Sequence, residues 1–319
     1  MSAIGPVALI TNPAAATTTA RLRELAVRTL GPAGLAWAID TTGPGDAAEL
    51  ARRAAAEGAA MVVTLGGDGI AHEAAGALGG GAVGLVPLPG GNANVLARAL
   101  GWPNSTERAL PLLSRALAAG RGRRIVLGRL VAGETERLFA INAGVGLDAD
   151  TVEWIEARPR VKRRLRQAGF AIGAARAAAR LRRAPPLRLE GAAAAPLDVT
   201  TVLAACGRPY TYLGPRPLDL VPDADFDGPL AYTALVRMRM PELARLLGEA
   251  ALGRPLPRDP AVILAGRVER ELVVTAGEPV AVQADGEALG RHLRVRLSRG
   301  PLLETLDPRS ARDSSSPGP

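Results

Sequence analysis

At 319 residues the chain is long enough for two domains, and arginine supplies nearly all of the basic charge behind its formal net charge of +8. The single cysteine, Cys206, excludes an intrachain disulfide and a zinc site made of cysteines, and it favours a reducing, cytoplasmic setting. The N-terminus lacks the pattern of a signal peptide, and no charge-free apolar stretch reaches the roughly 20 residues of a membrane span.

Residues 1–127 alternate between short apolar runs and stretches with helical spacing. The expected strands are 7–11, 35–39, 61–65 and 83–87, and the expected helices are 19–30, 46–57, 70–78, 95–100 and 105–119. This order is typical of a mainly parallel sheet with helices on both faces, so we expect an α/β domain. Ligands of such sheets bind beyond the carboxyl ends of the strands.

Two glycine-rich loops fall at those strand ends. They are Gly66-Gly67-Asp68-Gly69 and Gly90-Gly91-Asn92-Ala93-Asn94, and each follows an apolar strand and precedes a helix. Glycine lets the backbone approach a ligand closely, and the N–H groups at a helix start point toward an anion. Two such loops, one strand-helix unit apart, predict a polyphosphate ligand, and Asp68 predicts a Mg²⁺ ion between it and the phosphates.

Residues 128–306 change character, and we expect a second, β-rich domain there, a sandwich with helical insertions at 162–182 and 241–252. The expected strands, which begin just before this domain, are 125–131, 137–143, 187–190, 197–205, 230–237, 262–265, 268–275, 279–284 and 292–297. The polar, Ser- and Pro-rich residues 307–319 predict a disordered tail.

Two acidic motifs in the second domain each have two interpretations. Asp285-Gly286-Glu287 lies between alternating apolar residues, which by itself indicates a hairpin turn. Asp223, Asp225 and Asp227 alternate before Gly228, which suits either a hard cation or an acidic surface turn.

Residues 158–183 contain many arginines, Lys162 and no acidic residue. The segment is consistent with a basic amphipathic helix on an anionic bilayer, and equally with a solvated helix face. It lacks interleaved aromatic residues, so we do not expect nucleic-acid binding.

Six segments, in order, resemble motifs of the diacylglycerol kinase catalytic domain family, which includes bacterial lipid kinases, sphingosine kinases and ceramide kinases. They span residues 12–287 and are Asn12-Pro13, Gly66–Gly69 with Glu73, Gly91–Arg98, Ile141–Ala149, Pro222–Gly228 and Asp285–Glu287. The resemblance implies an ATP-binding α/β domain like that of NAD kinases and diacylglycerol kinases, a β-sandwich lipid domain, and a site in the cleft.

The resemblance also assigns roles to residues. Glu287 or Asp285 would be the catalytic base, with Glu287 as our first choice, and Asp227 and Asp68 would serve Mg²⁺ sites. The expected ATP-binding residues are Asn12, Pro13, Thr42, Gly66, Gly67, Asp68, Gly69, His72, Glu73, Gly91, Asn92 and Asn94. His72 and Glu73 also fit as ordinary first-turn helix residues, because the helix dipole alone favours an acidic residue there.

Several positions depart from the family pattern. Ile70 and His72 stand where a threonine and an asparagine are usual, and Asn92 replaces a threonine. The residues after Asn12-Pro13 are Ala14-Ala15-Ala16-Thr17, without the usual Ser-Gly or Lys. Sphingosine kinases resemble this chain at the first two positions.

We therefore expect a cytoplasmic, ATP- and Mg²⁺-dependent lipid kinase that meets its lipid at a membrane surface, with peripheral contact through 158–183 as one option. Diacylglycerol is the default acceptor and a sphingoid base the second choice. A kinase of NAD type acting on a soluble acceptor and a non-catalytic nucleotide or lipid sensor are the alternatives. The oligomeric state stays open, with a homodimer as one option.

Overall fold

The computed structural model describes residues 4–158, 186–236, 245–246, 248–249, 252–254 and 259–311. The chain forms two compact units, unit 1 (Met1–Ile125 with Pro301–Pro319) and unit 2 (Val126–Gly300). Residues 301–306, which the sequence analysis places in the second domain, thus belong to unit 1. The expected helix at 162–182 and the basic segment that contains it lie outside the described residues, apart from Arg158, and so does most of the expected helix at 241–252.

Unit 1 is built on a parallel sheet of four strands in the order β2-β1-β3-β4. These strands are β1 (Val7–Thr11), β2 (Leu35–Asp40), β3 (Met61–Gly66) and β4 (Gly84–Pro89). Every residue of β1, β3 and β4 is buried, whereas β2 lies at the edge and alternates between half-buried and exposed residues. Continuous apolar runs are the expected sequence of strands that are covered on both faces.

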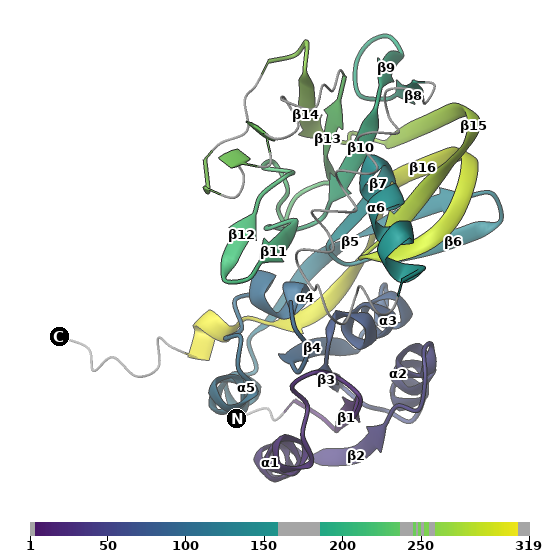
Figure 1. The fold of residues 1–319 in the computed structure, drawn as a ribbon. Helices are drawn as coiled ribbons and strands as arrows, with labels where there is room; N and C mark the ends of the chain where they lie inside the picture. The colour runs from purple at the N-terminus through teal and green to yellow at the C-terminus, as the bar shows by residue number, and fades with distance from the viewer. Residues whose placement is uncertain are drawn as a thin grey trace. The chain divides into compact units, whose positions relative to one another are not determined.

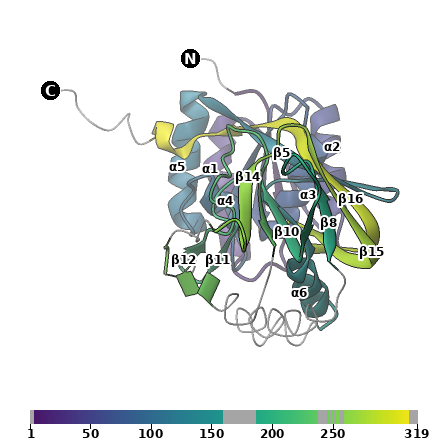
Figure 2. The same ribbon diagram turned by 90° about the horizontal axis from the view of Figure 1, so that it is seen from above.

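Helices cover both faces of this sheet. They are α1 (Ala20–Leu30), α2 (Asp46–Ala56), α3 (Asp68–Leu78), α4 (Val95–Ala99) and α5 (Thr106–Ala119), with the short 3₁₀ helix η1 (Gly31–Ala33) after α1. Right-handed crossovers require α1 on one face and α2 and α3 on the other. Figures 1 and 2 show this arrangement, with α5 beside α1.

The described part of unit 2 consists mainly of one branched, antiparallel sheet of ten strands. Their order is β14-β13-β10-β7-β15-β16-β5-β6, with β8 pairing with β15 and β9 with β8. The strands are β5 (Gly122–Ala132), β6 (Thr135–Phe139), β7 (Asn142–Gly146), β8 (Leu187–Glu190), β9 (Leu197–Val199), β10 (Thr201–Ala205), β13 (Ala231–Leu235), β14 (Ile263–Arg267), β15 (Glu271–Ala284) and β16 (Glu287–Leu306). A separate hairpin joins β11 (Thr211–Leu213) to β12 (Arg216–Leu218). The parallel-sheet unit and the β-rich unit confirm the expected fold class.

One helix lies beside the long β15–β16 hairpin in unit 2. Figure 1 shows this helix, α6 (Leu147–Glu156), next to the end of the hairpin at which β15 turns into β16. Arg291 of β16 bonds to both Asp150 and Glu153 of α6, with closest distances of 2.6 and 2.5 Å. The main-chain N–H of Ala288 donates to Glu156 Oε2 at 3.1 Å. The helix is therefore tied to the hairpin along its length.

The expected tail differs from the structure at its start. Pro308–Ala311 form a 3₁₀ helix, η2, in contact with α5, and Pro308 is buried. The prediction of disorder from 307 onward was wrong for this turn, because burial of an apolar proline offsets the polar composition around it. Residues 312–319 lie outside the described residues.

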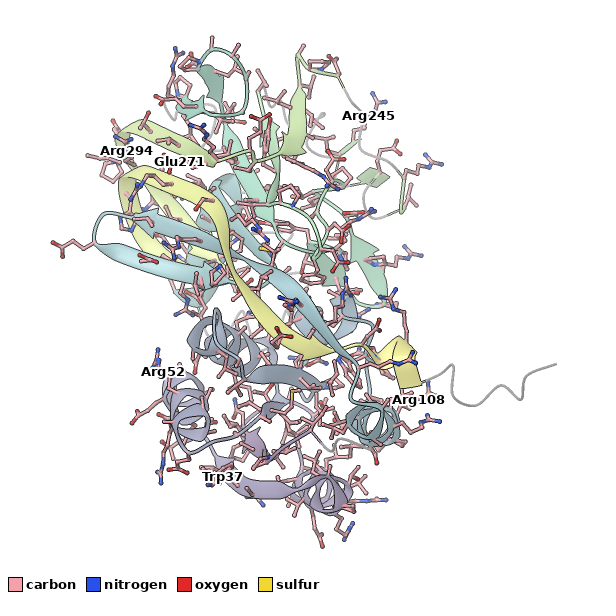
Figure 3. The ribbon with its side chains drawn as sticks, turned by 180° about the vertical axis from the view of Figure 1, so that it is seen from behind. Trp37, Arg52, Arg108, Arg245, Glu271 and Arg294 are labelled. Carbon is pink, nitrogen blue, oxygen red and sulfur yellow. The ribbon has the colours of Figure 1, made fainter. Side chains whose placement is uncertain are left out.

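Exposed arginines occur in both units of the described part of the chain. Figure 3 labels Arg52 on α2, Arg108 on α5 and Arg294 on β16, and all three are exposed. Within the described residues, no helix combines the length and apolar character needed to cross a membrane. Cys206 is a buried free thiol.

Candidate functional site

Three loops of unit 1 meet at the carboxyl ends of β1, β3 and β4. Main-chain hydrogen bonds join them, from Asn12 N to Leu65 O at 2.9 Å and from Gly90 N to Gly66 O at 2.7 Å. The N–H of Thr17 donates to Gly90 O at 3.0 Å. The structure therefore brings the predicted residues around Asn12 together with both glycine loops.

The two glycine loops lie in direct backbone contact. A Cβ atom on Gly91 would lie 2.5 Å from Gly67 Cα, and one on Gly90 would lie 2.8 Å from Gly66 Cα. Real Cβ atoms do not approach other atoms so closely, so both positions need glycine for contact between the loops. These glycines are therefore explained first by packing between β3 and β4.

The N-terminus of α3 is open in a way that suits an anion. Its N-cap residue, Gly67, has an extended backbone and provides no side-chain acceptor. By contrast, Thr19 and Ser105 accept hydrogen bonds from the first turns of α1 and α5. Gly69 is exposed, and a Cβ atom there would meet nothing within 4 Å. The first N–H groups of α3 and the positive end of its dipole fit a phosphate group.

Asp68 links the first glycine loop to the helix after the second. Its Oδ1 atom accepts hydrogen bonds from Val95 N at 2.5 Å and from Leu96 N at 3.4 Å. These are the first N–H groups of α4, which lacks a cap from its own N-cap residue, Asn94. Both bonds use Oδ1, and the carboxylate is partly exposed. The aspartate is thus a helix cap whose second oxygen, Oδ2, takes no part in these two bonds.

Asn94 closes the second loop on itself. Its Oδ1 accepts from Gly91 N at 2.8 Å, and its Nδ2 donates to Asn104 Oδ1 at 2.7 Å. The residue is buried and has a φ of 49°, a conformation that asparagine tolerates well. Asn92, at the tip of this loop, is exposed. Binding of ATP by Asn94 and Asn92 stays a prediction, and the contacts of Asn94 in the structure are with Gly91 and Asn104.

Glu73 and Thr42 both serve the start of α2. The carboxylate of Glu73 accepts from Gly45 N at 2.9 Å and from Ala47 N at 3.1 Å. Thr42 Oγ1 donates to Asp46 Oδ2 at 2.6 Å, and this hydrogen bond lowers the pKa of Asp46. Asp46 is the first residue of α2 rather than its N-cap. Binding of ATP by Glu73 and Thr42 stays a prediction, and their contacts in the structure are with α2.

The two departures from the family pattern after the first loop are both buried. Ile70 lies under the loop, where a Cβ atom on Gly66 would meet its Cδ1 at 2.6 Å. His72 is 6% exposed. An apolar residue at position 70 therefore contributes to packing beneath the glycine loop.

The Asp285-Gly286 pair forms the turn between β15 and β16, as the sequence pattern alone indicates. Both residues have positive φ, 50° and 81°, and the flanking Ala284 and Glu287 are directly paired. The carboxylate of Asp285 accepts three main-chain hydrogen bonds at 2.7 to 3.0 Å, from Ala140 N, Ile141 N and Asn142 N. This side chain therefore anchors the turn to the segment before β7.

Glu287 has a different environment. Its side chain is 36% exposed, and its Oε2 atom accepts from Arg137 Nη2 of β6 at 2.5 Å. The hairpin therefore presents one anchored and one accessible carboxylate. Of the two predicted catalytic residues, Glu287 has the geometry of a group that can meet a substrate.

A buried polar network lies beneath this turn. Asp148 Oδ2 accepts from Tyr210 Oη at 2.8 Å and from Gln283 Nε2 at 2.6 Å. Gln283 Nε2 also donates to Asn142 Oδ1 at 3.0 Å. Burial raises the pKa of the Asp148 carboxyl, against the lowering effect of the two donors. The Asp148 carboxyl can lie against the main chain of β7 because residue 144 is glycine. A Cβ atom at this position would collide with Asp148 Oδ2.

The sequence patterns predict no role for these four residues as a group. Asn142 and Asp148 fall in a motif quoted for the resemblance, but Gln283 and Tyr210 were missed. The sequence feature that could have indicated this network is Gln283 itself, a polar amide between the apolar residues Val282 and Ala284, which are both buried. Buried polar side chains are usually hydrogen-bonded, so an amide in an apolar strand predicts a buried partner.

The loop with the predicted cation site, Asp223 to Asp227, contains a local turn with two exposed carboxylates. Asp225 and Asp227 are exposed, and Asp225 Oδ1 accepts from Asp227 N at 3.1 Å in a local turn. Among the described residues no three acidic, histidine or cysteine side chains come together in a way that could hold a metal ion. Asp223, Asp225 and Asp227 therefore do not form an array of three carboxylates. A site of Asp227 with main-chain carbonyls stays a prediction.

Comparisons with known proteins agree with this picture. Residues 6–130 match the family described as the diacylglycerol kinase catalytic domain. A crystal structure of a diacylglycerol kinase from Bacillus anthracis is similar over 94% of this chain and 96% of its own, with a TM-score of 0.67 and 18% identity. An NAD kinase from Archaeoglobus fulgidus, crystallised with ATP, is similar over 97% and 96%, with a TM-score of 0.52 and 12% identity. These two likenesses show the fold. No curated protein matches the sequence.

Proposed function

We propose that the protein is a kinase that transfers the γ-phosphate of ATP to a lipid hydroxyl, because residues 6–130 match the diacylglycerol kinase catalytic domain family. The observation that carries the proposal is the contact between the two glycine loops beside the open N-terminus of α3. Strand ends that bring glycine loops and helix N–H groups together are suited to a polyphosphate.

In unit 1 the proposed roles follow the contacts. The main-chain N–H groups of Gly67 and Gly69 would hold phosphate oxygens, because the N-cap residue of α3 makes no side-chain cap hydrogen bond. Oδ2 of Asp68 would serve Mg²⁺, while its Oδ1 keeps α4 in place. The ion would neutralise phosphate charge, and the protein would contribute mainly positioning and charge stabilisation.

In unit 2 we assign Glu287 as the base that accepts the proton of the lipid hydroxyl. The hydroxyl oxygen of the lipid would attack the γ-phosphorus, the bond to the bridging β,γ-oxygen would break, and ADP would leave. The hydroxyl proton would pass to the Glu287 carboxylate, which is accessible, whereas Asp285 is held by three N–H groups. Diacylglycerol is the proposed acceptor, with a sphingoid base second because of Ile70 and His72.

The test is transfer of label from γ-labelled ATP into a product that extracts into organic solvent. Diacylglycerol, sphingosine and ceramide would be offered in mixed micelles with Mg²⁺. Labelled lipid is expected with the wild type and its loss with Glu287→Gln. Glu278→Gln, at an exposed position of β15, is the matched control and should keep its activity. Transfer that is equal in both variants would remove Glu287 from the chemistry.

The likeness to an NAD kinase in complex with ATP supports a second candidate, phosphate transfer to a soluble acceptor. NAD is therefore included as an acceptor, and the aqueous phase that remains after extraction is analysed separately for labelled NAD phosphate. Label in NAD and in none of the lipids would establish this second function. No label in any acceptor, together with a higher melting temperature in ATP and Mg²⁺, would indicate a nucleotide sensor.

A further inference from the structure

The turn that carries the acidic pair is supported from beneath by one side chain. Gln283, the last residue but one of β15, is 1% exposed. Its Oε1 accepts from Gly286 N at 2.9 Å, and its Nε2 donates to Asp148 Oδ2 at 2.6 Å. One amide thus joins the main chain of the Asp285-Gly286 turn to helix α6.

No other simple side chain fits this position equally well. The amide oxygen accepts from a main-chain donor, and the amide nitrogen lies within hydrogen-bond distance of three oxygens, Asp148 Oδ2, Asn142 Oδ1 and Tyr210 Oη. A glutamate would place a second carboxyl beside Asp148 without a donor between them, and an apolar residue would leave Asp148 without this bond. A fully engaged buried amide is a means of holding two elements in one fixed arrangement.

The consequence concerns Glu287, the residue after the turn. Glu287 pairs with Ala284, so its position along β16 depends on the conformation of the two residues between them. Asp285 is fixed by the N–H groups of 140–142, and Gly286 is fixed by Gln283. Since residues 285 and 286 both have positive φ, a turn without these bonds has other conformations open to it.

We propose that Gln283 is a positioning residue, which fixes the Asp285-Gly286 turn from Asp148 and thereby sets the place of the Glu287 carboxylate for proton transfer. The second half of this statement rests on the proposed function. Displacement of a catalytic group by about 1 Å can cost 10²-fold in rate, so a loss of 10- to 100-fold in kcat is expected when the link is removed.

The first experiment needs no activity. Hydrogen exchange is followed in the peptide that covers 283–288, in the wild type, Gln283→Glu, Gln283→Leu and Thr201→Val. Thr201 is the matched control, because it is buried in the same sheet and donates to Val145 O at 2.8 Å, not to a residue of the turn. We expect faster exchange of the turn in both Gln283 variants. At equal melting temperature, Thr201→Val should not show this increase. Unchanged exchange would overturn the proposal.

The second experiment is a double-mutant cycle on lipid phosphorylation. Gln283→Glu should lower kcat and leave the KM for ATP unchanged. In the Glu287→Gln background the same substitution should have little further effect, because Gln283 acts through Glu287. Losses that multiply would mean a general structural role and would contradict the proposal. Faster exchange at the turn in a protein without any kinase activity would refute the proposed function and leave the fixing of the turn by Gln283 in place.

Discussion

Oδ1 of Asp68 accepts a hydrogen bond from the main-chain N–H of Val95 at 2.5 Å, so the carboxylate of the first glycine loop caps the helix after the second. The two segments are 27 residues apart in sequence, and this bond keeps both loops in register at the strand ends. A carboxylate that makes this bond stabilises the fold whatever the function of the protein. Its role in chemistry must therefore be separated from its role as a cap.

Replacing Asp68 by Asn or by Ala separates the two roles. Asp68→Asn keeps an oxygen for Val95 N but loses the charge, so we expect near-normal stability and a fall of about 10²-fold or more in phosphate transfer. Asp68→Ala also loses the cap and should cost about 1 kcal/mol of unfolding free energy. Urea unfolding and the labelled-ATP assay measure the two effects. Full activity in Asp68→Asn would exclude a role in binding Mg²⁺.

Two glycines of the loops should respond differently to alanine. Gly91→Ala puts a Cβ atom 2.5 Å from Gly67 Cα, so it should destabilise unit 1 by about 1–3 kcal/mol. Gly69→Ala meets nothing within 4 Å and should fold normally, yet bind ATP more weakly because the methyl group projects from the start of α3. Gly31→Ala, also in open space in unit 1, is the control. Normal ATP affinity in Gly69→Ala would argue against phosphate binding at this helix.

The order of strands, helices and glycine loops could be predicted from local patterns, because apolar runs and turn residues act over short stretches. The partners of the polar side chains could not. Glu73 reaches Gly45 across 28 residues, and Gln283 reaches Asp148 across 135. A single sequence shows which residues can donate or accept hydrogen bonds, but it does not show which donors pair with which acceptors. The Asp-Gly turn shows the opposite case, since its local signal was correct whatever the chemistry of its acids.

Glu73 should matter for stability and little for ATP. Its two oxygens hold Gly45 N and Ala47 N, so Glu73→Ala removes the acceptors at the start of α2 and should cost about 1 kcal/mol. Thermal unfolding gives the loss, and the shift of melting temperature with added ATP reports binding. Glu49→Ala, at an exposed position in the same helix, is the control. Loss of the ATP-induced shift at unchanged stability would instead assign Glu73 to the nucleotide.

The partly buried carboxyl of Asp148 should give the fold a distinct pH dependence. Burial raises its pKa above the ordinary value of 3.8, so the folded protein holds this proton more tightly than the unfolded chain. Its contribution to stability is therefore most favourable below 3.8 and declines as pH rises through the folded pKa.

Asp148→Asn removes the pH-dependent contribution of this carboxyl to the free energy of unfolding. We expect the unfolding free energy of Asp148→Asn, relative to that of the wild type, to rise between pH 4 and pH 8, by about 1.4 kcal/mol for each unit of pKa difference. Urea unfolding at several pH values measures it, with Glu190→Gln, an exposed carboxyl of the same unit, as control. A difference that is constant with pH would show that Asp148 has no raised pKa in the folded state.

Substitution of the two carboxylates of the hairpin should distinguish a structural role for Asp285 from a role as base for Glu287. In Asp285→Asn an amide N–H₂ replaces one of the oxygens that face Ala140 N, Ile141 N and Asn142 N, which should cost about 1–3 kcal/mol of unfolding free energy. The positive φ of residue 285 does not prevent this substitution, since asparagine tolerates it. Glu287→Gln should leave the melting temperature nearly unchanged and lower lipid phosphorylation by about 10²- to 10⁴-fold. Asp198→Asn, in an exposed ion pair of unit 2, controls for loss of charge. The reverse pattern, with stable Asp285→Asn inactive and Glu287→Gln active, would move the proton acceptor to Asp285.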